Sequence, residues 1–159
     1  MGLIEDIKKL HQWFVRRGYT LSVAESCTGG ALSHLITEVP GASRFFLGGI
    51  VAYDVRIKTD ILGVPEETIE RHSVVSAECA LEMARAVKRL FGSTHGIATT
   101  GNLGPEAQGG RPVGEVYVGI STPEGEDAIM LSLHAERREN KAEVVKKAIN
   151  IFLERIAKT

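Results

Sequence analysis

The chain has 159 residues, of which 43% are hydrophobic and 25% are charged, and its formal net charge is −1. This length and composition predict one globular domain over residues 1–159 with a substantial core. The near-neutral charge gives no electrostatic footprint for nucleic acid, no apolar run is long enough to cross a membrane, and the acid-containing N-terminus does not resemble a signal peptide. We therefore expect a cytoplasmic protein that binds neither nucleic acid nor a membrane.

The first half of the chain alternates segments of helical apolar spacing with short apolar runs typical of strands. Glycine and proline separate these segments, as at Gly18 and at Val39-Pro40-Gly41. In chain order we predict a helix at 3–17, a strand at 20–24, a helix from 31 to about 38, a strand at 45–53, a short helix at 54–62 capped by Asp54, and another at 65–72.

The second half contains one long amphipathic helix, then strands, then a final helix. Ser76 is the predicted N-cap of the first of these helices, and the short connection Thr122-Pro-Glu-Gly125 predicts an antiparallel hairpin. In chain order we predict a helix from 76 to 91, a strand at 95–100, a polar loop at 102–112, strands at 114–121 and 127–134, and a helix at 137–157.

This alternation of helices and strands predicts a three-layer α/β/α sandwich on a mixed, mostly parallel sheet. In such sheets ligands bind outside the carboxyl ends of the parallel strands. Ser26 and Thr100-Gly101 both follow predicted strands directly, so we expect them at the same edge of the sheet.

The turn Ser26-Cys27-Thr28-Gly29-Gly30 carries two hydroxyls, a thiol and two glycines between a strand and a helix. Glycines permit close approach of the backbone, and the first N–H groups of a helix lack internal partners. Such a turn is suited to holding a phosphate or to stabilising an oxyanion beside a nucleophile. The alternative is that Ser26 or Thr28 simply caps the helix.

A serine nucleophile needs a base, and none of the five histidines (His11, His34, His72, His95 and His134) stands at an obvious strand end beside a matching acid. Lys58, which follows the second strand, is the alternative, because a buried lysine or one beside a cation such as Arg56 is neutral enough to accept a proton. The other interpretation is an ordinary solvated lysine. The two cysteines, Cys27 and Cys79, show neither metal-ligand spacing nor a disulfide framework, so we expect no metal site.

Two further segments are candidates for ligand binding. The glycine-rich loop from Thr100 to Gly110 matches neither the P-loop nor the dinucleotide fingerprint, but it follows a strand end. Arg137, Arg138 and Lys141 crowd the start of the last helix, where cations oppose the helix dipole, so they either bind an anion or form an ordinary charged surface.

With these residues in place, the chain resembles the C-terminal domain of the competence-damage-inducible (CinA) family, which includes stand-alone nicotinamide-nucleotide amidohydrolases. The resemblance runs from about residue 5 to residue 156, and its most specific parts are Glu25-Ser-Cys-Thr-Gly-Gly30 and Ala52-Tyr53 followed by Lys58. The other matching segments are Val39-Pro-Gly41, Gly48-Gly-Ile-Val-Ala-Tyr53, Leu62-Gly-Val64, Thr100-Gly101, Gly104-Pro105 and Pro112-Val-Gly114.

The resemblance implies an enzyme that deamidates nicotinamide mononucleotide to nicotinate mononucleotide and ammonia, without a cofactor. It implies that Ser26 is the nucleophile and Lys58 the base, with Tyr53 as a third catalytic residue and backbone after Ser26 as oxyanion donor. The expected substrate-binding residues are Cys27, Thr28, Gly29, Gly30, Thr100, Gly101, Asn102 and Arg137. We also expect a homo-oligomer, a dimer or larger.

The sequence departs from the family pattern in two places. Relatives usually carry Thr-Gly-Ile-Ala-Gly-Pro and then glycines, where this chain has Thr100-Gly-Asn-Leu-Gly-Pro-Glu-Ala-Gln108. Glu106 in this loop would oppose a phosphate. Relatives also often have two arginines four residues apart, where this chain has Arg137 and Lys141. The alternative function is therefore a nucleotide-binding module with an altered substrate or without turnover.

Overall fold

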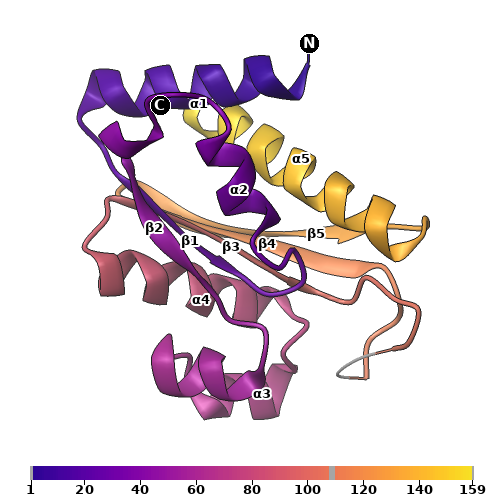
Figure 1. Ribbon diagram of the computed structural model, residues 1–159. Coiled ribbons are helices and arrows are strands. Elements are labelled where there is room, and N and C mark those ends of the chain that lie inside the picture. The colour runs from indigo at the N-terminus through magenta and orange to yellow at the C-terminus, as the bar shows by residue number, and fades with distance from the viewer. Residues whose placement is uncertain (1, 108–109, 159) are drawn as a thin grey trace.

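The computed structural model describes residues 2–107 and 110–158, and within them a single five-stranded sheet forms the centre of the molecule (Figure 1). The strand order is β2-β1-β3-β4-β5, and β1 pairs in parallel with both β2 and β3. β4 is antiparallel to both of its neighbours, so it runs against the other four strands. The strands are β1 (Leu21–Glu25), β2 (Phe46–Val51), β3 (His95–Gly101), β4 (Glu115–Thr122) and β5 (Gly125–Ser132).

Helices cover both faces of this sheet, which confirms the predicted three-layer sandwich (Figure 1). One face is covered by α1 (Leu3–Arg17), α2 (Ala31–Thr37) and α5 (Arg137–Ile156), and the other by α3 (Glu66–His72) and α4 (Ala77–Phe91). A separate hydrophobic core fills the space on each side. No helix in the described ranges combines the length and the apolarity needed to span a bilayer.

Several predicted boundaries are confirmed, and each has a local cause. α1 ends where Gly18 adopts a left-handed conformation with φ 67° and donates its N–H to the carbonyl of Val15. α4 begins after Ser76, whose Oγ accepts a hydrogen bond from the N–H of Cys79 at 3.0 Å. At both positions a single residue type provides the conformation or the hydrogen bond that a helix end needs, so the sequence alone predicts the boundary.

Two predicted elements differ from the structure. β5 begins at Gly125 rather than 127, because Thr122 Oγ1 accepts hydrogen bonds from the N–H groups of Glu124 and Gly125 and tightens the turn. The helix predicted at 54–62 contains a short π-helix, η2 (Ile57–Ile61), in which the N–H of Leu62 donates to the carbonyl of Ile57, five residues earlier, at 3.0 Å. A 3-10 turn, η1 (Ala42–Arg44), precedes β2.

Candidate functional site

Ser26 and Lys58 meet at the carboxyl edge of the sheet. Ser26 follows β1 directly, Lys58 lies beyond the end of β2, and the two strands are parallel neighbours, so their carboxyl ends coincide. Lys58 Nζ lies 2.9 Å from Ser26 Oγ. Ser26 is 8% exposed and Lys58 is 2% exposed, so the interpretation of Lys58 as a solvated lysine is wrong.

The Lys58 amine is held by two main-chain carbonyls besides the serine. Nζ donates to the carbonyl of Ala52 at 2.7 Å and to that of Tyr53 at 3.0 Å. The π-type turn of η2 brings the side chain back toward these carbonyls, which precede it by six and five residues. A neutral amine has two hydrogens and one lone pair, so donation to both carbonyls leaves the lone pair for the Ser26 hydroxyl.

Burial lowers the pKa of Lys58 below its ordinary value, because removal from water disfavours the charged ammonium. The expectation that Arg56 contributes is not met. Its side chain is 84% exposed and lies 3.5 Å from Asp54, with which it forms an ion pair. Desolvation rather than a neighbouring cation therefore favours the neutral amine.

Neither Ser26 nor Thr28 caps α2, so the capping interpretation of these two residues is wrong. The N-cap position is Gly30, and the carboxylate of Glu25 accepts hydrogen bonds from the N–H groups of Leu32 at 2.8 Å and Ser33 at 2.9 Å. Glu25 thus satisfies N–H groups that the helix start would otherwise leave open. These groups are consequently occupied and do not face a phosphate.

The other side chains of the turn point inward. Cys27 packs into the hydrophobic core at 4% exposure, and burial raises the pKa of its thiol to about 12. Thr28 is 1% exposed and bonds to Glu25 and to Thr99 Oγ1. The side chains of Cys27 and Thr28 are therefore occupied within the fold, and their expected role in binding a substrate stays a prediction.

Gly29 and Gly30 shape the backbone of the turn. They have φ angles of 59° and 103°, and the latter is a conformation that residues with a Cβ rarely adopt. Lys141 Nζ would lie 3.7 Å from a Cβ placed on Gly29, so this amine from α5 reaches the turn that carries Ser26. The main-chain N–H groups of Thr28 and Gly30 make no hydrogen bond to the described part of the chain.

Thr100, Gly101 and Asn102 lie at the same edge, as predicted, but each has an internal structural task. Thr100 Oγ1 donates to the carbonyl of Val74 at 2.7 Å, and a Cβ on Gly101 would lie 2.6 Å from a methyl of Val116. Asn102 Oδ1 accepts from the N–H of Gly104 at 3.1 Å, which organises the loop after β3. All three residues thus have contacts within the fold, and their expected role in binding a substrate stays a prediction.

Arg137 spans the loop after β3 and the residue after β2. Its guanidinium donates to the carbonyl of Gly104 at 2.7 Å and to the hydroxyl of Tyr53 at 2.9 Å. Tyr53 therefore serves two neighbours: its carbonyl accepts from Lys58, while its side chain, 56% exposed, points to Arg137. Within the described residues, no hydrogen bond joins the Tyr53 hydroxyl to Ser26 or Lys58.

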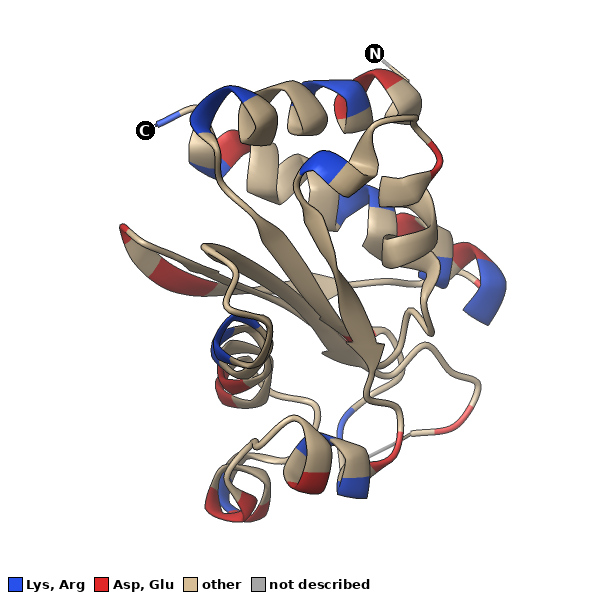
Figure 2. Ribbon diagram, turned by 60° about the vertical axis from the view of Figure 1, so that its left-hand side comes forward, with Lys and Arg blue, Asp and Glu red and all other residues tan. Residues whose placement is uncertain are grey.

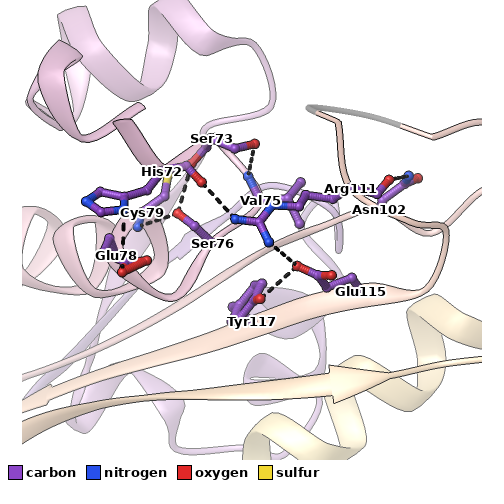
Figure 3. A network of polar contacts seen from close by, with 10 residues as sticks. All are labelled: His72, Ser73, Val75, Ser76, Glu78, Cys79, Asn102, Arg111, Glu115 and Tyr117. Atoms are coloured by element: carbon purple, nitrogen blue, oxygen red, sulfur yellow. Dashed lines mark hydrogen bonds and ion pairs between the residues drawn. The ribbon is translucent and has the colours of Figure 1, made fainter. Parts of the chain in front are cut away.

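A polar network fixes the loop after β3 to the connection between α3 and α4 (Figure 3). Arg111 donates to the carbonyl of His72 at 3.2 Å and to Glu115 Oε2 at 3.4 Å, and Tyr117 donates to the same carboxylate at 2.7 Å. This connection carries Val74, the partner of Thr100, so the network holds the segment that Thr100 contacts at the end of β3. Residues 108 and 109 of the same loop lie outside the described residues.

Sequence reasoning missed Glu25 and Asn140 as organising residues of the site. Asn140 is 1% exposed and donates to the carbonyls of Leu103 at 3.3 Å and Ala135 at 2.9 Å, which ties the start of α5 to the loop. A polar residue at an apolar position of the final helix was the available signal. In the described ranges, no group of three or more His, Cys, Asp and Glu side chains is arranged to hold a metal ion.

Comparison with known proteins shows the family of this chain. The model of the CinA C-terminal domain family matches residues 5–156. A CinA-like protein from Fervidobacterium nodosum is 40% identical over 140 residues, covering 84% of this chain and 34% of that protein. A CinA-like protein from Synechococcus elongatus is 47% identical over 124 residues, covering 76% and 29%. The chain thus spans about a third of the length of these curated relatives.

Solved structures extend the likeness to the whole fold. The competence damage-inducible protein A from Klebsiella pneumoniae superposes with a TM-score of 0.94 at 28% identity, covering 99% of this chain and 98% of that one. The competence/damage inducible protein CihA from Agrobacterium tumefaciens gives a TM-score of 0.90 at 30% identity, covering 97% and 96%. On the family model and these relatives together, the chain belongs to the CinA C-terminal domain family.

Proposed function

We propose that this domain is an amidohydrolase that deamidates nicotinamide mononucleotide, with Ser26 as nucleophile and Lys58 as general base. The observation that carries the proposal is the contact of 2.9 Å between Lys58 Nζ and Ser26 Oγ, in a site where burial lowers the lysine pKa. A serine hydroxyl is a weak nucleophile unless an adjacent base takes its proton. A serine–lysine pair is one known solution to this requirement.

In the first half of the reaction, neutral Lys58 takes the proton of Ser26 while Oγ forms a bond to the carboxamide carbon. The two carbonyls of Ala52 and Tyr53 keep the amine in place during this transfer. The resulting oxyanion needs N–H donors, and the candidates in this turn are the N–H groups of Thr28 and Gly30, which make no hydrogen bond to the described residues. Lys58 then gives its proton to the amide nitrogen, the C–N bond breaks, and ammonia leaves.

In the second half, water hydrolyses the ester formed with Ser26. Lys58, neutral again, accepts a proton from water as the water oxygen bonds to the acyl carbon. The bond from that carbon to Ser26 Oγ breaks, the proton returns to Oγ, and nicotinate mononucleotide leaves. One base thus serves both halves, because its proton is returned at the end of each.

Arg137 and Lys141 are the groups suited to the phosphate of the nucleotide. Lys141 reaches the turn of Ser26, and Arg137 bridges Tyr53 and Gly104 beside it. The start of α2 is occupied by Glu25, so the phosphate must find its positive partners elsewhere. A planar guanidinium with several donors is well matched to phosphate oxygens.

The test is ammonia release from nicotinamide mononucleotide, with nicotinate mononucleotide identified by mass. The proposal expects turnover by the wild-type domain and none by Ser26→Ala. A calorimetric titration on the same samples separates the alternative of a nucleotide-binding module, for which nucleotide would bind without any release of ammonia. That second result would contradict the enzymatic proposal.

A further inference from the structure

Glu25 is a fully buried carboxylate that directly precedes Ser26. Charged residues lie mainly on the helices and loops, whereas the three parallel strands β1, β2 and β3, described in full, contain no Lys, Arg, Asp or Glu besides Glu25 (Figure 2). Burial of a carboxylate is costly unless hydrogen bonds replace its water. Here the donors are Thr28 Oγ1, the N–H groups of Leu32 and Ser33, and Ser33 Oγ at 2.7 Å.

These donors fall into two groups. Leu32 and Ser33 belong to α2, so their bonds cap the helix, whereas Thr28 belongs to the turn that carries Ser26. Capping of α2 requires only the bonds from Leu32 and Ser33. The bond from Thr28 thus ties the turn itself to the buried end of β1.

The same threonine connects the turn to β3. Thr28 Oγ1 lies 2.8 Å from Thr99 Oγ1, and the carbonyl of Thr99 accepts the N–H of Ser26 at 3.0 Å. On the other side, the carbonyl of Ser26 accepts the N–H of Gly29 at 3.1 Å. The main chain of Ser26 is therefore held at both its N–H and its carbonyl, within a network that ends on Glu25.

We propose that Glu25, acting through Thr28, is a positioning residue that keeps Ser26 Oγ within reach of Lys58 Nζ. The inference rests on the proposed function only in taking Ser26 as the nucleophile. Displacement of a reacting group by about 1 Å is enough to lower a rate on the order of 100-fold, so the orientation of this turn matters for chemistry as well as for folding. The side chains of Glu25 and Thr28 act through Ser26, whereas the main-chain N–H of Thr28 is a separate candidate for the oxyanion.

The experiment compares two variants that each remove one hydroxyl donor from Glu25. Thr28→Val removes the donor on the side of the turn, and Ser33→Ala removes the donor on the side of the helix. The readout is the rate at which a small fluorophosphonate modifies Ser26, followed by intact mass and peptide mapping. Lys58→Met gives the rate without the proposed base, and thermal unfolding gives the stability of every variant.

We expect Thr28→Val to slow the modification of Ser26 about tenfold or more, whereas Ser33→Ala stays close to the wild-type rate at a comparable loss of stability. Thr28→Ser, which keeps the hydroxyl, should recover much of the rate lost in Thr28→Val. Glu25→Gln should be slow as well, because its NH₂ group would face a donor where the carboxylate now accepts. If Glu25→Gln does not fold, the comparison of Thr28→Val with Ser33→Ala still tests the inference.

Three results would overturn the inference. Equal slowing in Thr28→Val and Ser33→Ala would mean that Glu25 acts as a helix cap alone. A wild-type rate in Thr28→Val would remove the link to Ser26, and absence of Ser26 modification in the wild type would remove the activated nucleophile itself. If nicotinamide mononucleotide is not turned over but the expected pattern of rates holds, the proposed substrate fails and the positioning role stands.

Discussion

Replacement of Lys58 by methionine is the most direct perturbation of the proposed chemistry. Methionine has a similar length and no charge, so the change removes the amine and fills most of its space. Three contacts of Nζ are lost, one to Ser26 Oγ and two to the carbonyls of Ala52 and Tyr53. The structure allows the catalytic and the structural cost of this change to be separated.

The structural cost should be small. The carbonyl of the buried Ala52 loses a donor, which costs about 1–3 kcal/mol, whereas removal of a buried amine relieves its desolvation. The catalytic cost should be large, because general-base assistance contributes about 10²–10⁴-fold, or about 3–5 kcal/mol of the barrier. Lys58→Met should therefore fold and bind nucleotide while turnover falls by at least this factor.

The assay is kcat and KM for nicotinamide mononucleotide across pH, with thermal unfolding of the same samples. In the wild type kcat/KM should rise with pH as Lys58 loses its proton, with a midpoint below the usual lysine value near 10.4, because burial lowers this pKa. Lys58→Met should lack this rise, and Lys58→Arg should not restore the rate, because guanidinium does not give up a proton in this range. Near wild-type turnover in Lys58→Arg would refute the reasoning, since positive charge alone would then suffice.

The remaining predictions concern the nucleophile, the phosphate and a buried histidine. Ser26→Ala should abolish ammonia release, whereas Cys27→Ala should keep most of it, since burial raises the thiol pKa to about 12; the reverse pattern would make Cys27 the nucleophile. Arg137→Ala should raise KM for the mononucleotide about 10- to 100-fold and change KM for the unphosphorylated riboside little. Arg138→Ala is the control, because Arg138 is exposed at the next position of α5. An equal rise in KM for both substrates would argue against a phosphate contact. Burial lowers the pKa of His95 to about 4, so the folded protein disfavours the protonated imidazole. The neutral imidazole therefore contributes its full stabilisation above about pH 6.5, and the free energy of unfolding should fall by about 3 kcal/mol in total as the pH drops to 4 and below. Urea unfolding should show this loss in the wild type and a flatter dependence in His95→Asn, and equal slopes would contradict it.

The fold was predictable wherever a residue type decides the local structure. Gly18 ends α1 and Ser76 starts α4, because a left-handed glycine and a serine cap act within one turn of their own position. Apolar spacing gave the strands, but it did not show that the turn before Gly125 would tighten around the hydroxyl of Thr122. The sequence also did not predict the π turn of η2, because apolar spacing over five residues does not distinguish a π turn from an α turn.

The candidate site was predictable in its place but not in its connections. Both Ser26 and Lys58 follow predicted strands, so topology placed them at one edge, while their contact across 32 residues of sequence depends on the pairing of β1 with β2. In the sequence, Glu25 was recognised only as one residue of the motif that carries Ser26. That its carboxylate reaches the N–H groups of Leu32 and Ser33 follows only from how the chain turns back at Gly29 and Gly30.

The π turn of η2 couples two requirements that lie on different sides of one short segment. Lys58 must reach Ser26, while Leu62, 3% exposed, must remain in the core beneath α4. An α-helix over the same residues would advance by about 100° per residue, which is more than a π turn advances, so it would turn Leu62 away from its present direction relative to Lys58. A chain that formed a regular α-helix here would keep every residue of the recognisable motif and still lose either the contact of Lys58 with Ser26 or the packing of Leu62, so the turn between these two residues matters for activity together with the lysine itself.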